Sequence, residues 1–466
     1  MKIGEAIISE IIKDKEVISA TIVGSYSDTK NIENIGDLDV VIICKKLTKK
    51  NYLKINSRIK KIKFGIKTLI NPTFGPMKIG CKNSLPIHLM IYDVKSHIQH
   101  VLKSPFTCFD WERSKIYRGK SLKNIYSVKQ LQLNDFINAR RNSNEYLKDI
   151  KKNRISIRSY KFQGKKVLLS KKYVRIDQRN RGEFVYHIIN FLIINLYKFL
   201  NDKNIKVKDK NFDNLFLKIS NNNKKLLKQF KILREKKKSK AIYYDKKTLN
   251  LALVFIQYFN NYIKNLKKEF LEINFVRHAE TSFNKKEFFL GSRNNPDIIE
   301  NKKKKISNSR FNCIITSNLL RSRMTSKLYY SKRNLVSKLI TEIDYGKVDG
   351  LTVKKAKKQY PNLFKSWKKG IDVKFPNGEN TRDVIQRVKK FIILLKKFKK
   401  GEKILIISHS YFIRVFFAFV LKLDQKKAYK IKVDHLKIFQ FLLKGNKFTS
   451  NFDRADYYNI LTQTHD

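Results

Sequence analysis

The stretch that decides the fold of the second half of the chain is LEINFVRHAETSFN, residues 271–284. It opens with an apolar run, and Arg277 and His278 stand at the end of that run, followed at once by acidic and hydroxyl residues. A short apolar run bounded by polar residues is typical of a buried strand. Since α/β sheets place their sites at the carboxyl ends of strands, the pair at 277–278 is a candidate for chemistry.

Further strand-like runs follow this one, at FNCIITSN (311–318) and EKILIISHS (402–410). Each leads directly into a helical stretch, NLLRSRMTSKLYYSK (318–332) and YFIRVFFAFVLKL (411–423). Strands that alternate with helices predict parallel βαβ units. Residues 271–466 are therefore predicted to form a three-layer α/β/α domain with a mostly parallel sheet, and His409 would stand at a strand end as His278 does.

The residue types around these strand ends suit phosphoryl transfer. A neutral imidazole, as at His278, is a good nucleophile near neutral pH. A phosphoryl group needs arginine clamps, because the guanidinium fork matches two phosphate oxygens. Arg277 is adjacent, and Arg321 and His409 can arrive from other elements. Glu342 is the best candidate for the acid that protonates the leaving oxygen.

Five segments in order resemble the histidine phosphatase superfamily, which includes the phosphoglycerate mutases. They are VRHAETSFN, TSNLLRSRMTS, EIDYGKVDG, PNGENTRDVIQRV and ILIISHSYFIR, and together they cover nearly all of residues 271–466. The resemblance implies that His278 becomes a phosphohistidine and that Glu342 is the general acid. It also implies a phosphate pocket made by Arg277, Arg321, His409, Thr281 and Asn284. No cofactor is expected for this domain.

Two positions depart from the family pattern. Ser410 and Tyr411 follow the second histidine where a glycine is common, so Tyr411 is expected to narrow the substrate pocket. Asp349 stands where the family usually has glutamate. The spacing between the five segments is compact, which favours plain hydrolysis over a mutase reaction that needs lid segments to exclude water.

A different chemistry is indicated upstream by VGSYSDTKNIENIGDLDVVI, residues 23–42. Asp37 and Asp39 alternate on a predicted strand, so both side chains point to one face. Two carboxylates on one face suit a divalent cation such as Mg²⁺. Gly24 and Ser25, just after another strand-like run, would let the backbone approach a phosphate.

This pattern resembles the nucleotidyltransferase fold signature, over roughly residues 15–125. The resemblance implies Mg²⁺, a nucleoside triphosphate as substrate and a third carboxylate on a later strand. In LPIHLMIYDV (85–94) the candidate for that carboxylate is Asp93, while His88 can occupy its usual place instead. Residues 1–125 are thus expected to form a mixed-sheet nucleotidyltransferase-like domain.

Residues 126–270 are expected to form a helical domain, because they lack proline, are poor in glycine and repeat apolar residues at helical spacing. The apolar run FVYHIINFLIINLYKFL (184–200) contains His, Asn and Lys, so it is interpreted as a buried element rather than a membrane span. The N-terminus carries charges throughout, and a cytoplasmic protein without membrane contact is expected.

The net charge of +63 comes from lysines spread over all regions of the chain. It attracts anionic substrates, and it leaves nucleic acid as a partner that is open but not favoured. The four cysteines form no C-x-x-C pair, which argues against a disulfide framework or a zinc knuckle. The leading interpretation is a bifunctional enzyme: a phosphatase acting on a small phosphorylated metabolite, joined to a Mg²⁺-dependent nucleotidyltransferase. The alternative keeps the phosphatase and gives the N-terminal module a non-catalytic role in binding nucleotide or nucleic acid.

Overall fold

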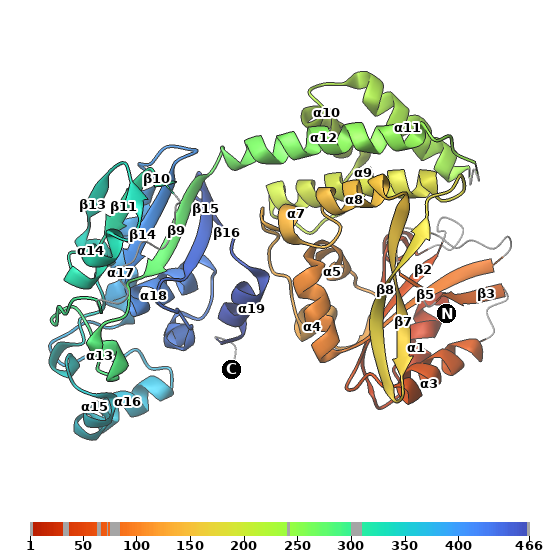
Figure 1. Ribbon diagram of the computed structural model, residues 1–466. Helices are drawn as coiled ribbons and strands as arrows, with labels where there is room; N and C mark the ends of the chain where they lie inside the picture. Colours follow the sequence, from red (N-terminus) through yellow and green to blue (C-terminus); the bar gives the residue numbers. More distant parts are fainter. Residues whose placement is uncertain are drawn as a thin grey trace. The chain divides into compact units, whose positions relative to one another are not determined.

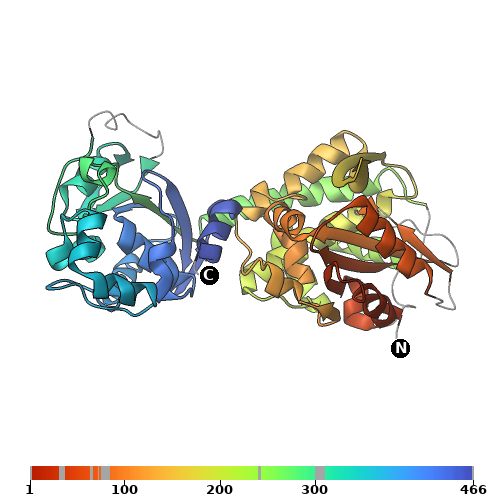
Figure 2. The same cartoon turned by 90° about the horizontal axis from the view of Figure 1, so that it is seen from below.

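The chain divides into two compact units, Met1–Lys264 and Asn265–Asp466. This is a computed structural model that describes residues 3–30, 37–62, 67–71, 73–74, 84–239, 243–299 and 310–463. In Figures 1 and 2 the first unit runs from red to light green and the second from green to blue. The division falls close to the predicted boundary at residue 270, while the predicted boundary at residue 125 lies inside the first unit.

The C-terminal unit is built on a six-stranded sheet of order β13-β11-β14-β9-β15-β16. Strands β13, β11, β14 and β9 are parallel, and β15 and β16 add an antiparallel hairpin beside β9. The strand bounds are β9 Leu271–Arg277, β11 Cys313–Thr316, β13 Asn334–Val336, β14 Lys403–Ser408, β15 Ile438–Lys444 and β16 Lys447–Ser450; β10 Arg310–Phe311 and β12 Tyr330–Ser331 pair separately.

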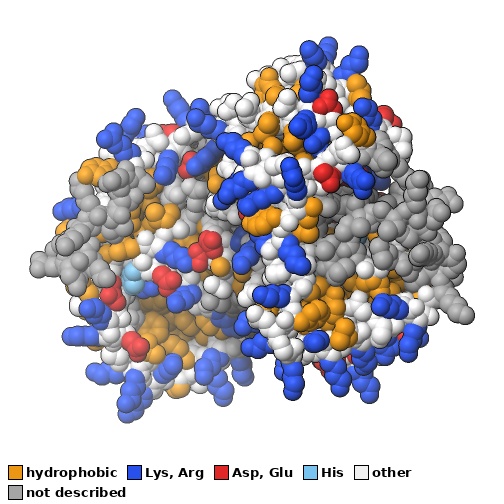
Figure 3. All heavy atoms as spheres, turned by 45° about the vertical axis from the view of Figure 1, so that its right-hand side comes forward, with side chains coloured by type: hydrophobic (Ala, Val, Ile, Leu, Met, Phe, Trp, Pro, Cys, Tyr) orange, Lys and Arg blue, Asp and Glu red, His pale blue; other side chains and the backbone are white. Residues whose placement is uncertain are grey.

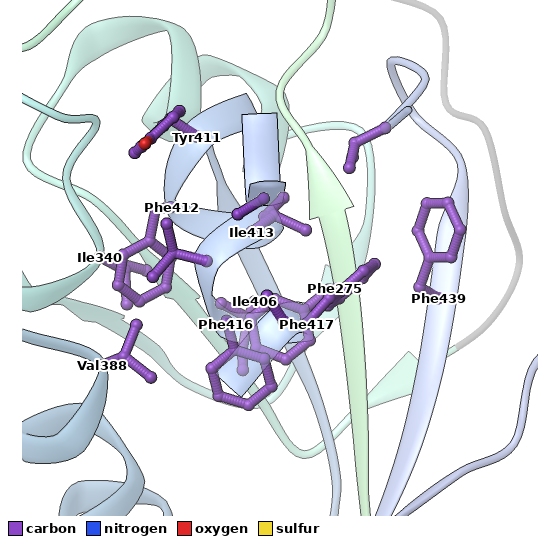
Figure 4. Close-up of a cluster of buried hydrophobic side chains, with 14 of the residues drawn as sticks. Phe275, Ile340, Val388, Ile406, Tyr411, Phe412, Ile413, Phe416, Phe417 and Phe439 are labelled. Atoms are coloured by element: carbon purple, nitrogen blue, oxygen red, sulfur yellow. The ribbon is translucent and has the colours of Figure 1, made fainter. Parts of the chain in front are cut away.

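Apolar side chains alternate between the two faces of the central strands. On β14, Ile404 and Ile406 belong to the larger core, whereas Leu405 and Ile407 belong to the smaller core on the other face. The larger core is rich in phenylalanine, and the ring centroids of Phe275 and Phe416 lie 4.3 Å apart (Figure 4). Removing one such buried ring typically costs about 3–5 kcal/mol. The mostly parallel sheet with two buried faces agrees with the predicted three-layer architecture.

Helices and short turns complete the C-terminal unit. They are α13 Ser282–Lys285, α14 Leu320–Ser326, α15 Val353–Gln359, α16 Pro361–Lys368, α17 Thr381–Leu395, α18 Ser410–Val420 and α19 Arg454–Gln463, with 3-10 turns η2 Lys338–Ile340, η3 Gly346–Val348 and η4 Gln425–Lys430. The helix expected over 318–332 is shorter than predicted, because the chain leaves α14 at Ser326 and adds strand β12.

The N-terminal unit contains a five-stranded mixed sheet of order β3-β5-β2-β1-β6. Strand β2 pairs antiparallel with β1 and parallel with β5, and β5 pairs parallel with β3. The bounds are β1 Val17–Val23, β2 Leu38–Cys44, β3 Lys67–Asn71, β5 Ser84–Asp93 and β6 Tyr117–Gly119. The predicted mixed sheet is therefore present, and β2 is buried at its centre.

Residues 126–270 are not purely helical, which corrects the expectation for this region. Strands β7 Arg154–Gln163 and β8 Lys166–Arg175 form a long hairpin, and β7 also pairs with β4 Thr73–Phe74. The hydroxyl of Tyr160 on β7 donates to the carbonyl of Ile91 on β5 at 2.9 Å, so the hairpin is joined to the five-stranded sheet. The alternation of charged and apolar residues along β7 is the period of a strand, which the wider helical spacing concealed.

The helices of the N-terminal unit begin before β1 and dominate its second half. They are α1 Ile3–Ile11, α2 Ser25–Thr29, α3 Lys49–Lys60, α4 Val94–Lys103, α5 Pro105–Trp111, α6 Leu122–Ile125, α7 Asp135–Asn138, α8 Ser143–Lys151, α9 Arg181–Asn201, α10 Asp209–Ile219, α11 Lys224–Lys238 and α12 Thr248–Lys267. By length and composition α9 could cross a membrane, but just over half of its most apolar window, 56%, is buried inside the unit. This agrees with its interpretation as a buried element.

Candidate active site

The pairing register of two neighbouring strands brings the two predicted histidines together. Arg277, the last residue of β9, is the partner of Ser408, the last residue of β14. His278 and His409 follow immediately, and the backbone N–H of His278 donates to the carbonyl of Ser408 at 3.0 Å. The two imidazole centroids lie 5.1 Å apart, and both side chains are buried. Residues far apart in sequence thus form one site because β9 and β14 are adjacent and parallel.

The hydrogen bond made by His278 fixes its tautomer. Its Nδ1 lies 2.7 Å from the carbonyl oxygen of Ala279, and a carbonyl can only accept. Nδ1 therefore carries the hydrogen and Nε2 keeps its lone pair. The nucleophilic atom is the one that faces away from this backbone contact.

His409 is held by two partners in the opposite tautomer. The Nε of Arg321 donates to Nδ1 at 3.2 Å, so the hydrogen of this imidazole is on Nε2. Nε2 lies 2.7 Å from the hydroxyl of Ser317, which follows β11. His409 is also the N-cap residue of α18, so strand β14, helix α18 and helix α14 together set its position.

Arg321 is fully buried and is oriented by a loop. Its two terminal nitrogens donate to the carbonyls of Asn294 and Gly291 at 2.9 and 2.8 Å. Asp349 fixes that loop, since its carboxylate accepts from the backbone N–H groups of Gly291 and Arg293 at 3.0 and 2.9 Å. The aspartate noted as a departure from the family pattern is therefore a positioning residue for the arginine.

Arg277 and Arg414 add positive charge to the same pocket. One terminal nitrogen of Arg277 donates to the carbonyl of Val433 at 3.1 Å. Its Nε, like the Nε of Arg414 on α18, is buried and has no hydrogen-bond partner within the described part of the chain. Buried donors without partners are costly, and they suit a ligand that supplies several acceptor oxygens. Arg414 was not singled out from the sequence, although it lies in the segment quoted for His409.

Glu342 lies at the N-terminus of α18. Its carboxylate accepts from the backbone N–H of Tyr411 at 3.1 Å and of Phe412 at 3.2 Å. A helix N-terminus stabilises an anion, so the carboxylate is held in one place. Its charge acts on both Arg277 and Arg321. The role of Glu342 as the acid that protonates the leaving oxygen stays a prediction.

Thr281 and Asn284 form a cap on α13. The Thr281 hydroxyl accepts from the backbone N–H of Asn284 at 3.3 Å, and the Asn284 side chain accepts from the backbone N–H of Thr281 at 3.1 Å. Their polar groups therefore shape the chain directly after His278. Tyr411, expected to narrow the pocket, is buried in the larger core (Figure 4). Its hydroxyl is 2.9 Å from that of Thr381.

Burial and positive charge keep the histidines of the site neutral. Burial, followed by Arg321 and Arg277, lowers the pKa of both His278 and His409 well below the ordinary value. A third histidine, His435, donates from Nδ1 to the carbonyl of His278 at 2.6 Å, and burial lowers its pKa to about 4. Burial also lowers the pKa of Arg277 and of Arg321 to about 10, values that leave both charged at neutral pH.

These features define a class of protein domain: an α/β sheet with two buried, neutral histidines and several arginines at its carboxyl edge. Comparison with known proteins places the domain more narrowly. The histidine phosphatase superfamily (branch 1) matches residues 273–452. The C-terminal unit is thus a histidine phosphatase superfamily domain, as its five sequence segments predict.

Two curated relatives carry different names within that family. Phosphoserine phosphatase 1 of Hydrogenobacter thermophilus is 28% identical over 171 residues, which are 34% of this chain and 81% of the relative. A 2,3-bisphosphoglycerate-dependent phosphoglycerate mutase of Methylobacterium sp. is 27% identical over 167 residues, 32% of this chain and 78% of the relative. The solved α-ribazole phosphatase of Shigella flexneri is 18% identical, with a TM-score of 0.36, over 40% of this chain and 97% of that one.

A separate polar cluster lies in the N-terminal unit. Asp39 on β2 is the register partner of His88 on β5, and Nε2 of His88 lies 3.4 Å from Oδ2 of Asp37. One ligand atom from each of these three residues falls within 4.8 Å of the others. The structure thus brings together the two predicted carboxylates and adds the histidine that the sequence left as an alternative.

Asp93 is not part of this cluster, so its prediction as the third carboxylate is wrong. It pairs with Cys44 at the other end of β2, five residues from the pair formed by Asp39 and His88. At about 3.3 Å per residue the separation along the strands is on the order of 16 Å. Asp93 instead caps α4, where its side chain accepts from the backbone N–H of Ser96 at 2.7 Å.

Gly24 lies directly against the cluster. It follows Val23, the register partner of Asp39, and has φ +71°, which favours glycine. A Cβ at Gly24 would stand 2.5 Å from Oδ2 of Asp39. Ser25 begins α2 immediately afterwards and is exposed. The glycine therefore allows the backbone to lie against the Asp39 carboxylate, while the approach of a phosphate to Gly24 and Ser25 stays a prediction.

The three side chains of the cluster fit a divalent cation, and the histidine among them affects which metal is preferred. Asp37 and Asp39 supply the oxygen ligands that Mg²⁺ prefers. The imidazole of His88 is a ligand that Mg²⁺ rarely takes and that Mn²⁺ or Zn²⁺ accepts. The residues thus fit a divalent metal, and the histidine widens the choice beyond magnesium.

Proposed function

We propose that the C-terminal domain hydrolyses phosphomonoesters through a phosphohistidine at His278. The observation that carries this is the hydrogen bond from Nδ1 of His278 to the Ala279 carbonyl, which leaves the Nε2 lone pair free to attack. A bond forms between Nε2 and phosphorus while the bond from phosphorus to the ester oxygen breaks. Glu342 gives its proton to that oxygen, and Arg277 and Arg321 hold the phosphoryl oxygens.

The second half of the reaction regenerates the enzyme. Glu342, now a carboxylate, takes a proton from a water molecule as the water attacks phosphorus. The phosphorus–nitrogen bond breaks, its electron pair returns to Nε2 of His278, and inorganic phosphate leaves. Positioning and electrostatic stabilisation supply most of the acceleration in such a reaction.

The substrate class is a small phosphorylated metabolite. The relatives named for phosphoserine and bisphosphoglycerate support this, because both names describe small phosphate esters. Hydrolysis is favoured over the mutase reaction by the compact spacing of the segments around the site.

The test compares the purified wild type with His278→Ala on a generic aryl phosphate and on a panel of phosphorylated metabolites. His278→Ala should lower the rate of phosphate release by about 10³-fold or more, since no other group replaces the nucleophile. His187→Ala, a half-buried histidine of the N-terminal unit, is the matched control and should keep wild-type activity. Equal activity of His278→Ala and the control would overturn the proposal.

A second function, metal-dependent nucleotidyl transfer, is proposed for the N-terminal unit. The cluster of Asp37, Asp39 and His88 favours it. Its carboxylates would hold a divalent cation, which when bound would activate an acceptor hydroxyl and neutralise the diphosphate leaving group. Gly24 and Ser25 would face the phosphates of a nucleoside triphosphate. The acceptor would be a small metabolite.

This second proposal is tested by diphosphate release from each nucleoside triphosphate, with Mg²⁺ and separately with Mn²⁺, across sugars, phosphosugars and alcohols. Wild type should release diphosphate and Asp39→Asn should not. Absence of release under all conditions would remove the transferase. Metal-dependent nucleotide binding that survives Asp39→Asn would instead support a non-catalytic nucleotide-binding module. RNA binding that falls steeply with salt would support a nucleic-acid-binding module.

A further inference from the structure

A cavity of about 440 Å³ lies in the N-terminal unit, and no residue of the two sites described above lines it. It is enclosed by α4, the start of α8 and the β7–β8 hairpin, whose places in the fold are seen in Figure 1. Helix α4 begins at Val94, directly after β5 ends at Asp93, five residues beyond His88. None of the cluster residues Asp37, Asp39 and His88 lines the cavity.

Positive charge dominates the walls of this cavity. Five cationic side chains and two acidic ones line it: Lys103, Arg140, Arg141, Arg158, Lys171, Glu145 and Asp149. Asp149 is already engaged, since it accepts from Ser156 and pairs with Arg154 at 3.2 Å. Glu145 accepts from the backbone N–H of Arg141 at 2.8 Å. Two carboxylates thus face five cationic side chains, and both carboxylates also hold the local backbone in place.

The guanidinium groups of Arg140 and Arg141 make no hydrogen bond or ion pair with any part of the chain that the structure describes. Both side chains are half-buried. Burial, and then repulsion from Arg158 and Arg141, lowers the pKa of Arg140 to about 10; burial is also the first cause of the lowered pKa of Arg141. Half-buried arginines that repel one another and form no direct ion pair are costly to hold in place.

His100 adds a second and independent sign of a ligand. It is 4% exposed and lines the cavity. Its Nδ1 lies 3.1 Å from a terminal nitrogen of Arg158, which can only donate, so the hydrogen of the imidazole is on Nε2. That Nε2 is buried and has no hydrogen-bond partner among the described residues. A buried donor of this kind is normally satisfied, and a ligand acceptor would satisfy it.

The backbone at Arg141 also departs from what its side chain prefers. Its φ is +64°, in the left-handed region that glycine and asparagine adopt more readily. The next residue, Asn142, is the N-cap of α8, so the positive end of that helix begins beside the two arginines. Arg141 thus lies at the turn that leads into α8, next to the N-terminus of that helix.

We propose that this cavity binds a small organic phosphate or diphosphate, as a site separate from the phosphatase pocket and from the carboxylate cluster. Arg140, Arg141 and Arg158 would clamp the phosphate oxygens in the forked geometry that guanidinium groups favour. The apolar wall made by Leu168, Leu169 and Phe184 would take the organic part. The volume suits a ligand of the size of a metabolite.

The test uses methylenediphosphonate, a diphosphate analogue whose P–C–P bridge resists hydrolysis, in equilibrium dialysis with EDTA at physiological salt. EDTA removes divalent metals, so the carboxylate cluster cannot contribute through a metal. In the double variant Arg140→Gln/Arg141→Asn, the affinity of one binding site per chain should fall by at least about 30-fold. The phosphatase pocket is unchanged in this variant and contributes equally to both measurements.

A matched variant controls for the general attraction of anions to the positively charged chain. Arg179→Gln removes one positive charge from an exposed position outside the cavity and should bind as the wild type does. If the double variant binds methylenediphosphonate as tightly as Arg179→Gln does, the proposal is wrong. It is also wrong if both variants lose the same affinity relative to the wild type.

A second variant covers the case in which the double variant does not fold. Lys171→Glu changes an exposed residue of the cavity wall and should weaken binding about tenfold. Unchanged binding in Lys171→Glu, with the double variant unfolded, would overturn the proposal.

Discussion

At the scale of single residues, the C-terminal site holds two histidines in different tautomers, and the proposed mechanism depends on this difference. His278 donates through Nδ1 and keeps Nε2 for attack, while His409 accepts at Nδ1 from Arg321 and donates through Nε2. Burial beside arginines keeps both neutral. The sequence predicts these residues because their types suit the chemistry, but a tautomer depends on a neighbour that only the folded chain supplies.

Glu342 gives a prediction that depends on the leaving group. Glu342→Gln removes the proton donor and keeps an oxygen that can accept from the N-terminus of α18. For an alkyl phosphate, whose leaving oxygen needs a proton, kcat should fall by about 10²- to 10⁴-fold. For p-nitrophenyl phosphate, whose leaving group departs without a proton, formation of the phosphoenzyme should be nearly unchanged in rapid-mixing kinetics. An equal loss for both substrates would contradict the acid role.

Asp349 gives a prediction about positioning. Asp349→Asn weakens the hold on the loop at residues 291–294, so Arg321 should move and kcat/KM should fall by about 10- to 100-fold. For a substrate with a small leaving group, the loss should appear mainly as a higher KM, because the change affects phosphate binding more than the nucleophile. Asp349→Glu, which restores the charge usual at this position in the family, should recover most of the loss. No recovery, together with a lower unfolding temperature in both variants, would indicate a purely structural role.

At the scale of elements, strand register decides which residues meet. The pairing of Arg277 with Ser408 makes one site from two strand ends. The alternation of strands with helices predicts that both histidines lie at strand ends, but the adjacency of β9 and β14 is set by the strand order of the folded sheet. In the N-terminal unit the register between β2 and β5 selects His88 and places Asp93 at the far end. Sequence spacing within LPIHLMIYDV gives no register against β2, so Asp93 could not be rejected before the fold was known. The β7–β8 hairpin was missed for a related reason, since its alternation lies among helices.

Gly24 carries the prediction that belongs to this scale, since it joins β1 to α2. Gly24→Ala places a Cβ against Asp39 and strains a backbone with positive φ, so Asp39 must move. Binding of Mn²⁺ to the N-terminal unit should weaken about tenfold or more by isothermal titration. Ser25→Ala, one residue further, is the matched control and should bind as the wild type does. Equal binding by Gly24→Ala would show that Asp39 is not a ligand.

At the scale of the whole molecule, positive charge is spread over the surface, so the charge alone does not mark a binding site. Lys and Arg side chains cover the visible face with few acidic ones among them (Figure 3), in keeping with a net charge of +63. Such a surface draws anions to every region. It therefore could not reveal the cationic cavity of the N-terminal unit. The arginines of that cavity come from two separate segments, and the guanidinium groups of Arg140 and Arg141 have no hydrogen-bond partner among the described residues.

Acid stability is the prediction for the whole chain. Six histidines, His97, His100, His187, His278, His409 and His435, have lowered pKa values, with burial as the first cause. The unfolded chain binds protons at these positions below about pH 6.5 while the folded chain does not, so stability falls as the pH falls from about 6.5 towards 4. Each such histidine contributes a loss of up to about 1.4 kcal/mol per pH unit in that interval. Urea unfolding followed at pH 7.5, 6.0 and 5.0 measures it, and an unchanged free energy of unfolding would contradict the burial of neutral histidines.

The most direct test of the central claim is to trap the phosphoenzyme. Wild-type protein is mixed with an aryl phosphate for milliseconds and quenched in alkali, which preserves phosphohistidine, and its peptides are examined by mass spectrometry. If His278 is the nucleophile, one phosphoryl group is found, on the peptide that contains His278. This phosphoryl group is absent from His278→Ala and present in Glu342→Gln. Turnover of the ester by wild-type protein with the phosphoryl group on another residue, or undiminished turnover by His278→Ala, would contradict it.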